Sequence, residues 1–268
     1  MSSKFNCWSF RILACFIISL VMSSQATSES NVENKHGVTL AKKVYNRPDG
    51  RDSRSKVLLK LVRDGSQTRE RTFTLNRLDP SPKKVVTLIR FLSPADVKST
   101  GLLTIDKPNA ETDQWIYLPA VKRSRKISSS RQGGRFVGTD FFFEDLRDRK
   151  VEEDYHFLKG VDKINEKKTY VLVSTPKDSS SSVYGKKALW IHPESLLPLK
   201  SILYDKSGKP WKSTEVHRME KVQGIWTIMD TSMKDLKEGG YTRFIIDSIK
   251  YNLGLKESDF TKQALENP

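Results

Sequence analysis

The stretch SKVLLKLVRDGSQTRERTFTLN, residues 55–76, decides the fold class because its apolar residues recur with a period of two. Such alternation is typical of half-buried strands, in which successive side chains point to opposite faces. Asp64-Gly65, between the two runs, is a common hairpin turn. The stretch therefore predicts two antiparallel strands that share one apolar face, formed by Val57, Leu59, Leu61, Phe73 and Leu75.

Similar runs continue through most of the chain, and turn signals such as Ser207-Gly208, Gln223-Gly224 and Gly239-Gly240 separate several of them. The intervals between runs are too short to hold a helix at each crossover, which argues against a parallel sheet. The sequence thus predicts a mainly β, antiparallel protein. Its further strands are predicted over residues 84–91, 102–106, 113–118, 170–175, 187–192, 199–205, 214–222, 225–234 and 242–251.

Three short helices are expected beside the strands. Apolar residues at roughly helical spacing predict the first between Val32 and Tyr45, ended by the turn at residues 46–50. A turn or two over residues 141–146 has Thr139 or Asp140 as its cap, and a terminal segment over 260–265 has Ser258 or Asp259. These helices are too few to make a helical layer.

The first 26 residues have the pattern of a signal peptide. Lys4 and Arg11 precede an apolar run over residues 12–21, and small residues then lead to cleavage after Ala26. The run would span only about 15 Å as a helix, against a hydrocarbon core of about 30 Å. We expect export and a single mature domain over residues 27–268. Both cysteines, Cys7 and Cys15, leave with the leader, so the mature chain is predicted to lack disulfides and thiol chemistry.

The mature chain is strongly basic. Two of the 47 basic residues fall in the leader and none of the 32 acidic ones does, which leaves a net charge of +13. In an exported protein such a field favours anionic headgroups or acidic polymers over nucleic acid. The densest basic cluster is predicted either to touch an anionic surface or to be a solvated loop, and it comprises Lys122, Arg123, Arg125 and Lys126.

Signals of catalysis are weak. The four histidines, His36, His156, His192 and His217, are isolated, so no metal site is predicted, and no serine sits in a nucleophile elbow. Carboxylates between Glu144 and Asp154 are dense enough for a hydrolase, but interleaved arginines favour a solvated, ion-paired face. No catalytic residue and no cofactor are predicted. The rings of Phe141, Phe142 and Phe143 are consecutive, so they cannot all lie on the single apolar face of a helix. They are predicted either to pack in the core or to form a lid over an apolar cavity.

An ordered set of short sequence motifs resembles the outer-membrane lipoprotein-sorting, or LolA-like, family of periplasmic proteins. The strongest are WIYLPA at 115–120, RKI at 125–127 and GTDFFFEDL at 138–146. Others are RPDGRD at 47–52, FLSPAD at 91–96, WIHP at 190–193 and LPLK at 197–200. The resemblance spans nearly the whole mature chain, although the triple phenylalanine replaces a more usual mix of serine and aromatic residues.

The resemblance implies an incomplete antiparallel β barrel whose apolar concave side, covered by short helices, holds the acyl chains of a lipoprotein or lipid. It also implies a periplasmic carrier without enzymatic activity, between an inner-membrane transporter as donor and an outer-membrane acceptor. On this interpretation the cavity lining is Val57, Leu59, Leu61, Phe73, Leu75, Ile89 and Phe91, and the rim or lid is Trp115, Tyr117, Phe141, Phe142 and Phe143.

Two alternatives remain open. A non-catalytic binding module for an anionic polymer or surface would use the basic cluster at residues 122–126, and its binding would weaken steeply with salt. A carboxylate-dependent hydrolase would use residues 144–154, and Glu144→Gln would abolish its turnover.

Overall fold

In the computed structural model, which describes residues 34–63 and 67–267, thirteen strands form one antiparallel sheet. Their order is β6-β5-β4-β3-β2-β1-β13-β12-β11-β10-β9-β8-β7, so β6 and β7 are the two edges and the sheet does not close into a barrel. The strands are β1 (Asp52–Arg63), β2 (Gln67–Ser81), β3 (Lys84–Ser93), β4 (Gly101–Asp106), β5 (Asp113–Leu118), β6 (Arg123–Lys126), β7 (Asp154–Ile164), β8 (Lys167–Pro176), β9 (Lys186–Ile191), β10 (Pro198–Tyr204), β11 (Pro210–Val222), β12 (Ile225–Asp235) and β13 (Tyr241–Tyr251).

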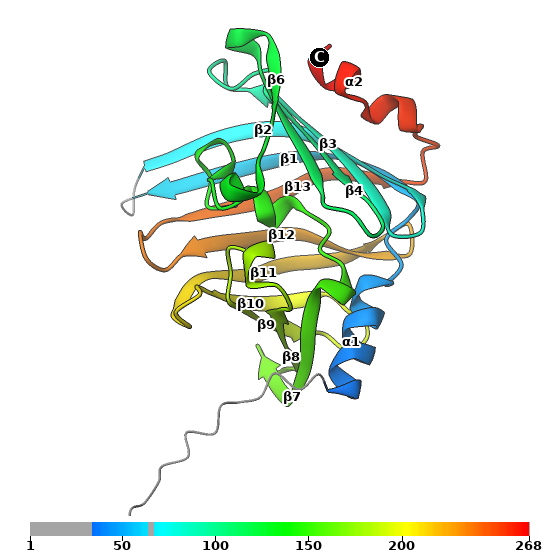
Figure 1. Cartoon of the computed structure of the whole chain (residues 1–268), viewed down its shortest axis with the longest axis vertical. Coiled ribbons are helices and arrows are strands. Elements are labelled where there is room, and N and C mark those ends of the chain that lie inside the picture. The colour runs from blue at the N-terminus through cyan, green and yellow to red at the C-terminus, as the bar shows by residue number, and fades with distance from the viewer. Residues whose placement is uncertain (1–33, 64–66, 268) are drawn as a thin grey trace, which may run out of the picture. The chain divides into compact units, whose positions relative to one another are not determined.

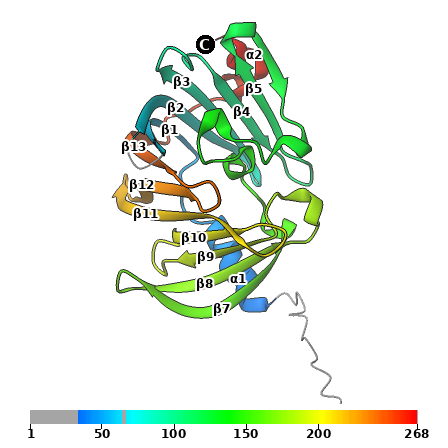
Figure 2. The ribbon, with the colours of Figure 1, turned by 90° about the vertical axis from the view of Figure 1, so that its left-hand side faces the viewer.

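The chain builds this sheet as two meanders (Figure 1). Strands β1 to β6 run outward to one edge, and β7 to β13 return from the opposite edge until β13 pairs with β1. Residues 127–153, which we call the crossing segment, connect the two edges and pass in front of the sheet (Figure 1). The sheet is strongly curved (Figure 2), and its concave face is the one that carries Leu59 and Phe73.

The predicted hairpin is confirmed by the pairing of β1 with β2, in which Val57 lies opposite Phe73 and Arg63 opposite Gln67. Its turn at Asp64-Gly65 lies outside the described residues, as do the predicted signal peptide, Cys7 and Cys15. The other predicted strands are all present, with ends that differ by a few residues. The predicted mainly β, antiparallel incomplete barrel is therefore the observed fold class.

Two strands escaped prediction, and both are edges. Strand β6 contains only arginine, serine and lysine, so it shows no apolar alternation. Strand β7 places Tyr155 and Phe157 on its exposed face and is interrupted by a bulge between Leu158 and Gly160, which hides its period of two. An edge strand forms from backbone pairing with a single neighbour, so its side chains need not follow a buried pattern.

Helix α1 (Lys35–Tyr45) confirms the predicted first helix, except that Val32 lies outside the described residues. Asn34 caps it by accepting a hydrogen bond from the Gly37 amide at 2.8 Å. The helix packs on β7 and β8, and a Cβ on Gly37 would lie 2.6 Å from the carbonyl oxygen of His156. This close approach seats α1 on the concave side, with Leu40 and Ala41 against Leu172.

The C-terminal segment covers the convex face at the other end of the sheet (Figure 2). It consists of the 3₁₀ turn η7 (Glu257–Phe260) and helix α2 (Lys262–Glu266). The predicted caps, Ser258 and Asp259, are wrong for α2: Thr261 caps it by accepting from the Ala264 amide at 3.0 Å. Phe260 and Leu265 pack on the convex side chains of β2 to β5, and Arg90 donates to the last carbonyls of α2.

The remaining 3₁₀ turns are short: η1 (Pro119–Val121), η2 (Ser129–Arg131), η3 (Phe136–Gly138), η4 (Phe143–Leu146), η5 (Val151–Glu153) and η6 (Ser179–Ser181). The predicted helix over residues 141–146 is thus a single turn, η4, that begins at Phe143. Neither Thr139 nor Asp140 caps it, because the Thr139 hydroxyl donates to the Phe136 carbonyl and Asp140 binds arginines of other elements.

Candidate functional site: an apolar cavity with a charged mouth

A cavity of about 1110 Å³ lies between the concave face, helix α1 and the crossing segment. Its volume is slightly above the range of roughly 300–1,000 Å³ usual for small-molecule sites. Four of the predicted lining residues line it, namely Leu59, Phe73, Leu75 and Ile89, and so does Phe141 of the predicted lid.

Residues that sequence reasoning did not select complete the apolar wall. Ala41 and Val44 come from α1, Leu172 and Leu189 from β8 and β9, Ile228 and Phe244 from β12 and β13, and Phe136 from the crossing segment. Most of them lie in predicted elements, where their alternation was a usable signal. The sequence could not show that β8 and β9 face β1 to β3 across the same space, because that depends on the curvature of the whole sheet.

The other three predicted lining residues lie beside the cavity in a solid part of the concave side. Val57, Leu61 and Phe91 are buried there against Phe136 and Phe143. The ring centroids of Phe73 and Phe91 are 5.4 Å apart, those of Phe91 and Phe136 are 5.6 Å apart, and those of Phe136 and Phe143 are 5.9 Å apart. Rings of the crossing segment thus fill this part, while the cavity remains next to it.

The three consecutive phenylalanines separate into three environments. Phe141 lines the cavity and faces Phe244, with ring centroids 6.2 Å apart. Phe142 is extended and points the other way, where it stacks on Tyr184 with an interplanar angle of 16°. Phe143 belongs to the solid part. Core packing therefore accounts for two of the rings, and only Phe141 reaches the cavity.

Trp115 and Tyr117, predicted at the rim or lid, are on the opposite face of the sheet. Both belong to the convex cluster under Phe260 and Leu265. The Lys262 ammonium lies 4.8 Å from the Trp115 ring centroid. The correction has a simple cause: β5 alternates, so Gln114 and Ile116 take the concave side and the two larger aromatic residues take the convex one.

The basic cluster of residues 122–126 lies at the β6 edge and away from the cavity lining. Lys126 is held by Asp113 at 2.6 Å, and the hydroxyl of Ser124 donates to Glu266. Lys122, Arg123 and Arg125 are exposed. Binding of an anionic surface by this cluster stays a prediction.

The carboxylates of the crossing segment are ion-paired as predicted, but several are buried rather than solvated. Asp140 is fully buried and binds Arg63 at 2.8 Å and Arg135 at 2.7 Å. Glu144 accepts from the Val183 amide at 2.6 Å and pairs with Lys187 at 3.3 Å.

These groups anchor the segment to β1, in the middle of the sheet, and to β9, near the β7 edge. Burial opposes ionisation of Glu144, yet Lys187 and two hydrogen bonds hold the pKa of its carboxyl below the usual range. Burial lowers the pKa of Lys212 to about 8, although Asp145 opposes the change at 3.4 Å. Since charge pairing engages the candidate catalytic carboxylates Glu144 and Asp145, the arrangement favours a structural role for them.

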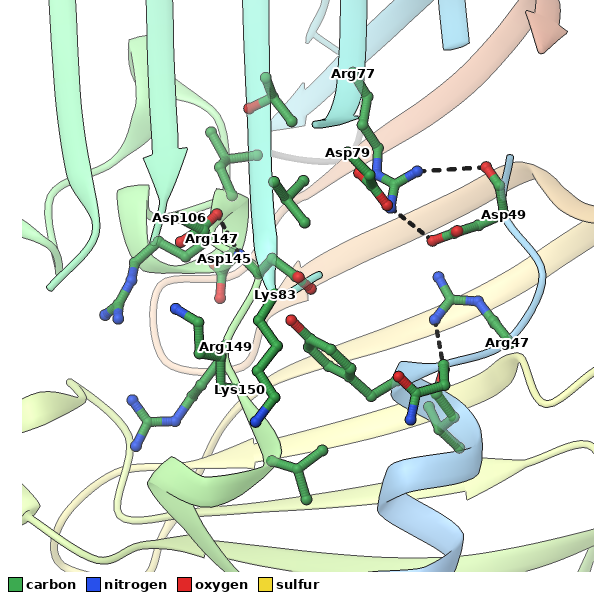
Figure 3. A pocket seen from close by; sticks show the side chains of 18 of the residues that line it. Arg47, Asp49, Arg77, Asp79, Lys83, Asp106, Asp145, Arg147, Arg149 and Lys150 are labelled. Carbon is green, nitrogen blue, oxygen red and sulfur yellow. Dashed lines mark hydrogen bonds and ion pairs between the residues drawn. The ribbon is translucent and has the colours of Figure 1, made fainter. Parts of the chain in front are cut away.

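Charged side chains surround the mouth of the cavity (Figure 3). Arg77 binds Asp49 at 2.8 Å and Asp79 at 2.6 Å, and Arg47 donates to the Val44 carbonyl at 2.9 Å. Lys83 is exposed beside them, whereas Arg147 and Lys150 also line the cavity but are largely buried (Figure 3).

One buried carboxyl, Asp106, and two partly buried ones, Asp79 and Asp148, also line the cavity. Burial raises the pKa of Asp106 to about 6 and, against the effect of Arg77, that of Asp79 to about 6. Burial also raises the pKa of Asp148. A molecule with an apolar tail and a polar end matches a cavity that combines an apolar wall with charged side chains at one end.

Three of the four histidines contact a serine hydroxyl. His156 is buried and bonds Ser174 at 2.8 Å, His192 lies 3.1 Å from the Ser195 hydroxyl, and His217 lies 2.9 Å from that of Ser232. Across residues 34–63 and 67–267, no group of three or more histidine, aspartate or glutamate side chains is placed to hold a metal ion. Neither helix of that part of the chain has the length and apolarity needed to cross a bilayer.

Comparison with known proteins places this fold. A family model described as an uncharacterized protein matches residues 83–267. A domain from Vibrio parahaemolyticus, described as outer membrane lipoprotein-sorting, is 28% identical with a TM-score of 0.82, over 86% of this chain and 98% of that one. The chain belongs to the family of that model, and its fold is that of the lipoprotein-sorting domain.

Two further structures resemble this LolA-like protein. A DUF1329 family protein from Desulfovibrio piger is 29% identical with a TM-score of 0.83, over 86% of this chain and 98% of that one. A LolA superfamily protein from Nitrosomonas europaea shares the fold at 19% identity and a TM-score of 0.67, over 87% of this chain and 99% of that one. A search of curated proteins found no significant match. This likeness in fold supports a carrier-like role in general.

Proposed function

We propose that this LolA-like protein is a periplasmic carrier that holds acyl chains of lipoproteins or lipids in its cavity and helps to move them to the outer membrane. The observation that carries the proposal is the cavity of about 1110 Å³, walled by apolar side chains from both meanders and left unfilled by the protein's own rings. An inner-membrane transporter as donor and an outer-membrane acceptor complete the proposed route, after removal of residues 1–26.

Hydrocarbon solvation supplies the driving force. Sheltering a CH₂ group from water is worth roughly 0.8 kcal/mol, so a sixteen-carbon chain gains on the order of 10 kcal/mol on leaving water. Such a chain does not leave a membrane quickly unless it enters another apolar site. The walls formed by Leu59, Leu75 and Ile228 offer one, and the charged mouth keeps the polar end of the cargo in contact with water.

Binding of cis-parinaric acid, a fluorescent fatty acid, tests this proposal. Leu75→Trp places a larger side chain in the cavity, and we expect it to weaken binding at least tenfold. Leu58→Trp is the matched control, because Leu58 precedes the cavity residue Leu59 and therefore points to the convex face. We expect the control to bind as the unchanged protein does.

Salt dependence separates the carrier from the anionic-polymer module. Acyl-chain binding should change little between low and high ionic strength, whereas polymer binding at residues 122–126 should weaken steeply. Mass spectrometry of organic extracts from gently purified protein should reveal copurified lipid. Protein that neither binds the fatty acid nor carries lipid would contradict the proposal.

A further inference from the structure

Three polar side chains form one row across strands β7, β8 and β9. His156 lies opposite Ser174, and Ser174 lies opposite Lys187 in the strand register. All three line the cavity, as do the apolar residues Leu172 and Leu189 on the same strands. Residues directly opposite each other in antiparallel strands have Cβ atoms about 4.5–5.5 Å apart. The row therefore brings an imidazole, a hydroxyl and an ammonium group together beside an apolar wall.

The two hydrogen bonds of His156 define which of its ring nitrogens carries the proton. Nε2 lies 2.9 Å from the carbonyl oxygen of Val151, and Nδ1 lies 2.8 Å from the hydroxyl oxygen of Ser174. Because a carbonyl oxygen only accepts, Nε2 is the donor, and Nδ1 of the neutral ring has the free electron pair. The Ser174 hydroxyl therefore donates to Nδ1. A serine that donates to a base, itself oriented by a third group, is the arrangement of an activated nucleophile.

Lys187 supplies a positive charge on the other side of Ser174. Its ammonium group pairs with Glu144 at 3.3 Å, which holds the side chain over the concave face. A cation at this position stabilises the negative charge that develops on the oxygen of a carbonyl group under attack. Ser174 and His156 are 4% and 6% exposed, so this stabilisation acts in a poorly hydrated place, where electrostatic interactions are stronger than in water.

We propose that Ser174 and His156 form a catalytic pair that hydrolyses long-chain acyl esters in the cavity. The inference rests on the proposed binding of acyl chains, because the apolar wall beside Ser174 is what selects a long-chain substrate. A carboxylic ester is the group that an activated serine attacks, and it is also the bond that joins acyl chains to glycerol in lipids.

The reaction has two steps, and His156 moves one proton in each. In the first step, the Ser174 oxygen bonds to the ester carbonyl carbon, Nδ1 takes the hydroxyl proton, and Lys187 stabilises the negative carbonyl oxygen. The bond from that carbon to the alcohol oxygen then breaks, and His156 gives its proton to the departing alcohol. In the second step, water attacks the acyl group on Ser174 by the same route, which releases the fatty acid and restores the serine.

Hydrolysis of p-nitrophenyl dodecanoate tests the proposal, because each acyl transfer releases coloured p-nitrophenolate. We expect the unchanged protein to release it faster than buffer does. Early quenching and mass spectrometry should find one dodecanoyl group on Ser174. Ser174→Ala should lower the protein-dependent rate by about a hundredfold or more, since it removes the nucleophile.

Ser232→Ala is the matched control. The Ser232 hydroxyl lies 2.9 Å from a ring nitrogen of His217, but neither residue lines the cavity. The variant therefore removes a serine of another serine–histidine pair, and it should hydrolyse the ester as the unchanged protein does. Equal rates for Ser174→Ala and the unchanged protein would overturn the proposal.

Binding of cis-parinaric acid separates this inference from the carrier proposal. Ser174→Ala should bind the fatty acid as the unchanged protein does, which also verifies that the variant folds. If the unchanged protein binds the fatty acid but does not hydrolyse the ester, the catalytic pair is wrong and the carrier stands. If it does not bind the fatty acid, both proposals are contradicted.

Discussion

The concave side of the sheet has a solid part and a hollow part, although the same alternating strands line both. In the solid part, Phe91 meets Phe136 and Phe143 of the crossing segment, and little space remains. In the hollow part, Leu75 and Ile228 border the cavity, although Leu75 also packs against the neighbouring core. Alternation therefore makes a face apolar, but what lies over that face decides between core and binding site.

The largest effect is expected from Phe91→Ala in the solid part. Phe91 is 1% exposed and touches rings on both sides, so its removal leaves a void that the rigid sheet cannot close. We expect the free energy of unfolding to fall by about 3–5 kcal/mol. Urea denaturation measures the change, and a loss below about 1 kcal/mol would show that the crossing segment does not pack there.

An intermediate effect depends on pH and concerns a carboxyl on the cavity wall. Burial raises the pKa of Asp106 to about 6 in the folded protein, above roughly 3.9 in the unfolded chain. Below about pH 4 both states hold the proton. As the pH rises from about 4 to 6, the unfolded chain loses the proton first, so stability is lost by up to about 3 kcal/mol and stays lower above that range.

Asp106→Asn should remove this loss. Relative to the unchanged protein, the variant should gain stability between pH 4 and pH 7, as measured by thermal unfolding at each pH. Glu166→Gln, at a side chain that is 93% exposed, is the control and should show almost no such gain. If the stability of Asp106→Asn and that of the unchanged protein change with pH in the same way, burial does not raise the pKa of Asp106.

The smallest effect is expected from Leu75→Ala in the hollow part. Because Leu75 borders existing space, truncation enlarges the cavity without removing a full set of neighbours. We expect a loss of about 1 kcal/mol or less, compared with roughly 2–5 kcal/mol for leucine in a packed core. Urea denaturation beside Phe91→Ala gives the comparison, and equal losses would mean that the two parts are packed alike.

Sequence reasoning succeeded where a local pattern and a local cause coincide. Period-two runs located most strands, and the hairpin of β1 with β2 was predicted from two such runs. It missed β6 and β7, because their side chains do not alternate between buried and exposed positions in a regular way. It also placed Trp115 on the wrong face of the sheet, because an aromatic side chain can pack on either face. The family resemblance supplied the incomplete barrel, which alternation alone did not specify.

The buried charges of the crossing segment show the same limit. Residues 144–154 look solvated in sequence because acids and bases are interleaved. Yet the most buried carboxylates of the crossing segment have partners on distant strands: Arg63 and Thr242 hold Asp140, and Lys187 holds Glu144. No local pattern in the sequence indicates an ion pair whose two residues are dozens of positions apart.

The sequence by itself determined that this chain forms antiparallel strands with one apolar face, since the period of two is a property of each extended segment. Only the tertiary structure decided which part of that face is filled and which is hollow. The reason is physical: strand curvature and the path of residues 127–153 set the distance between opposing side chains, and those distances depend on the whole sheet.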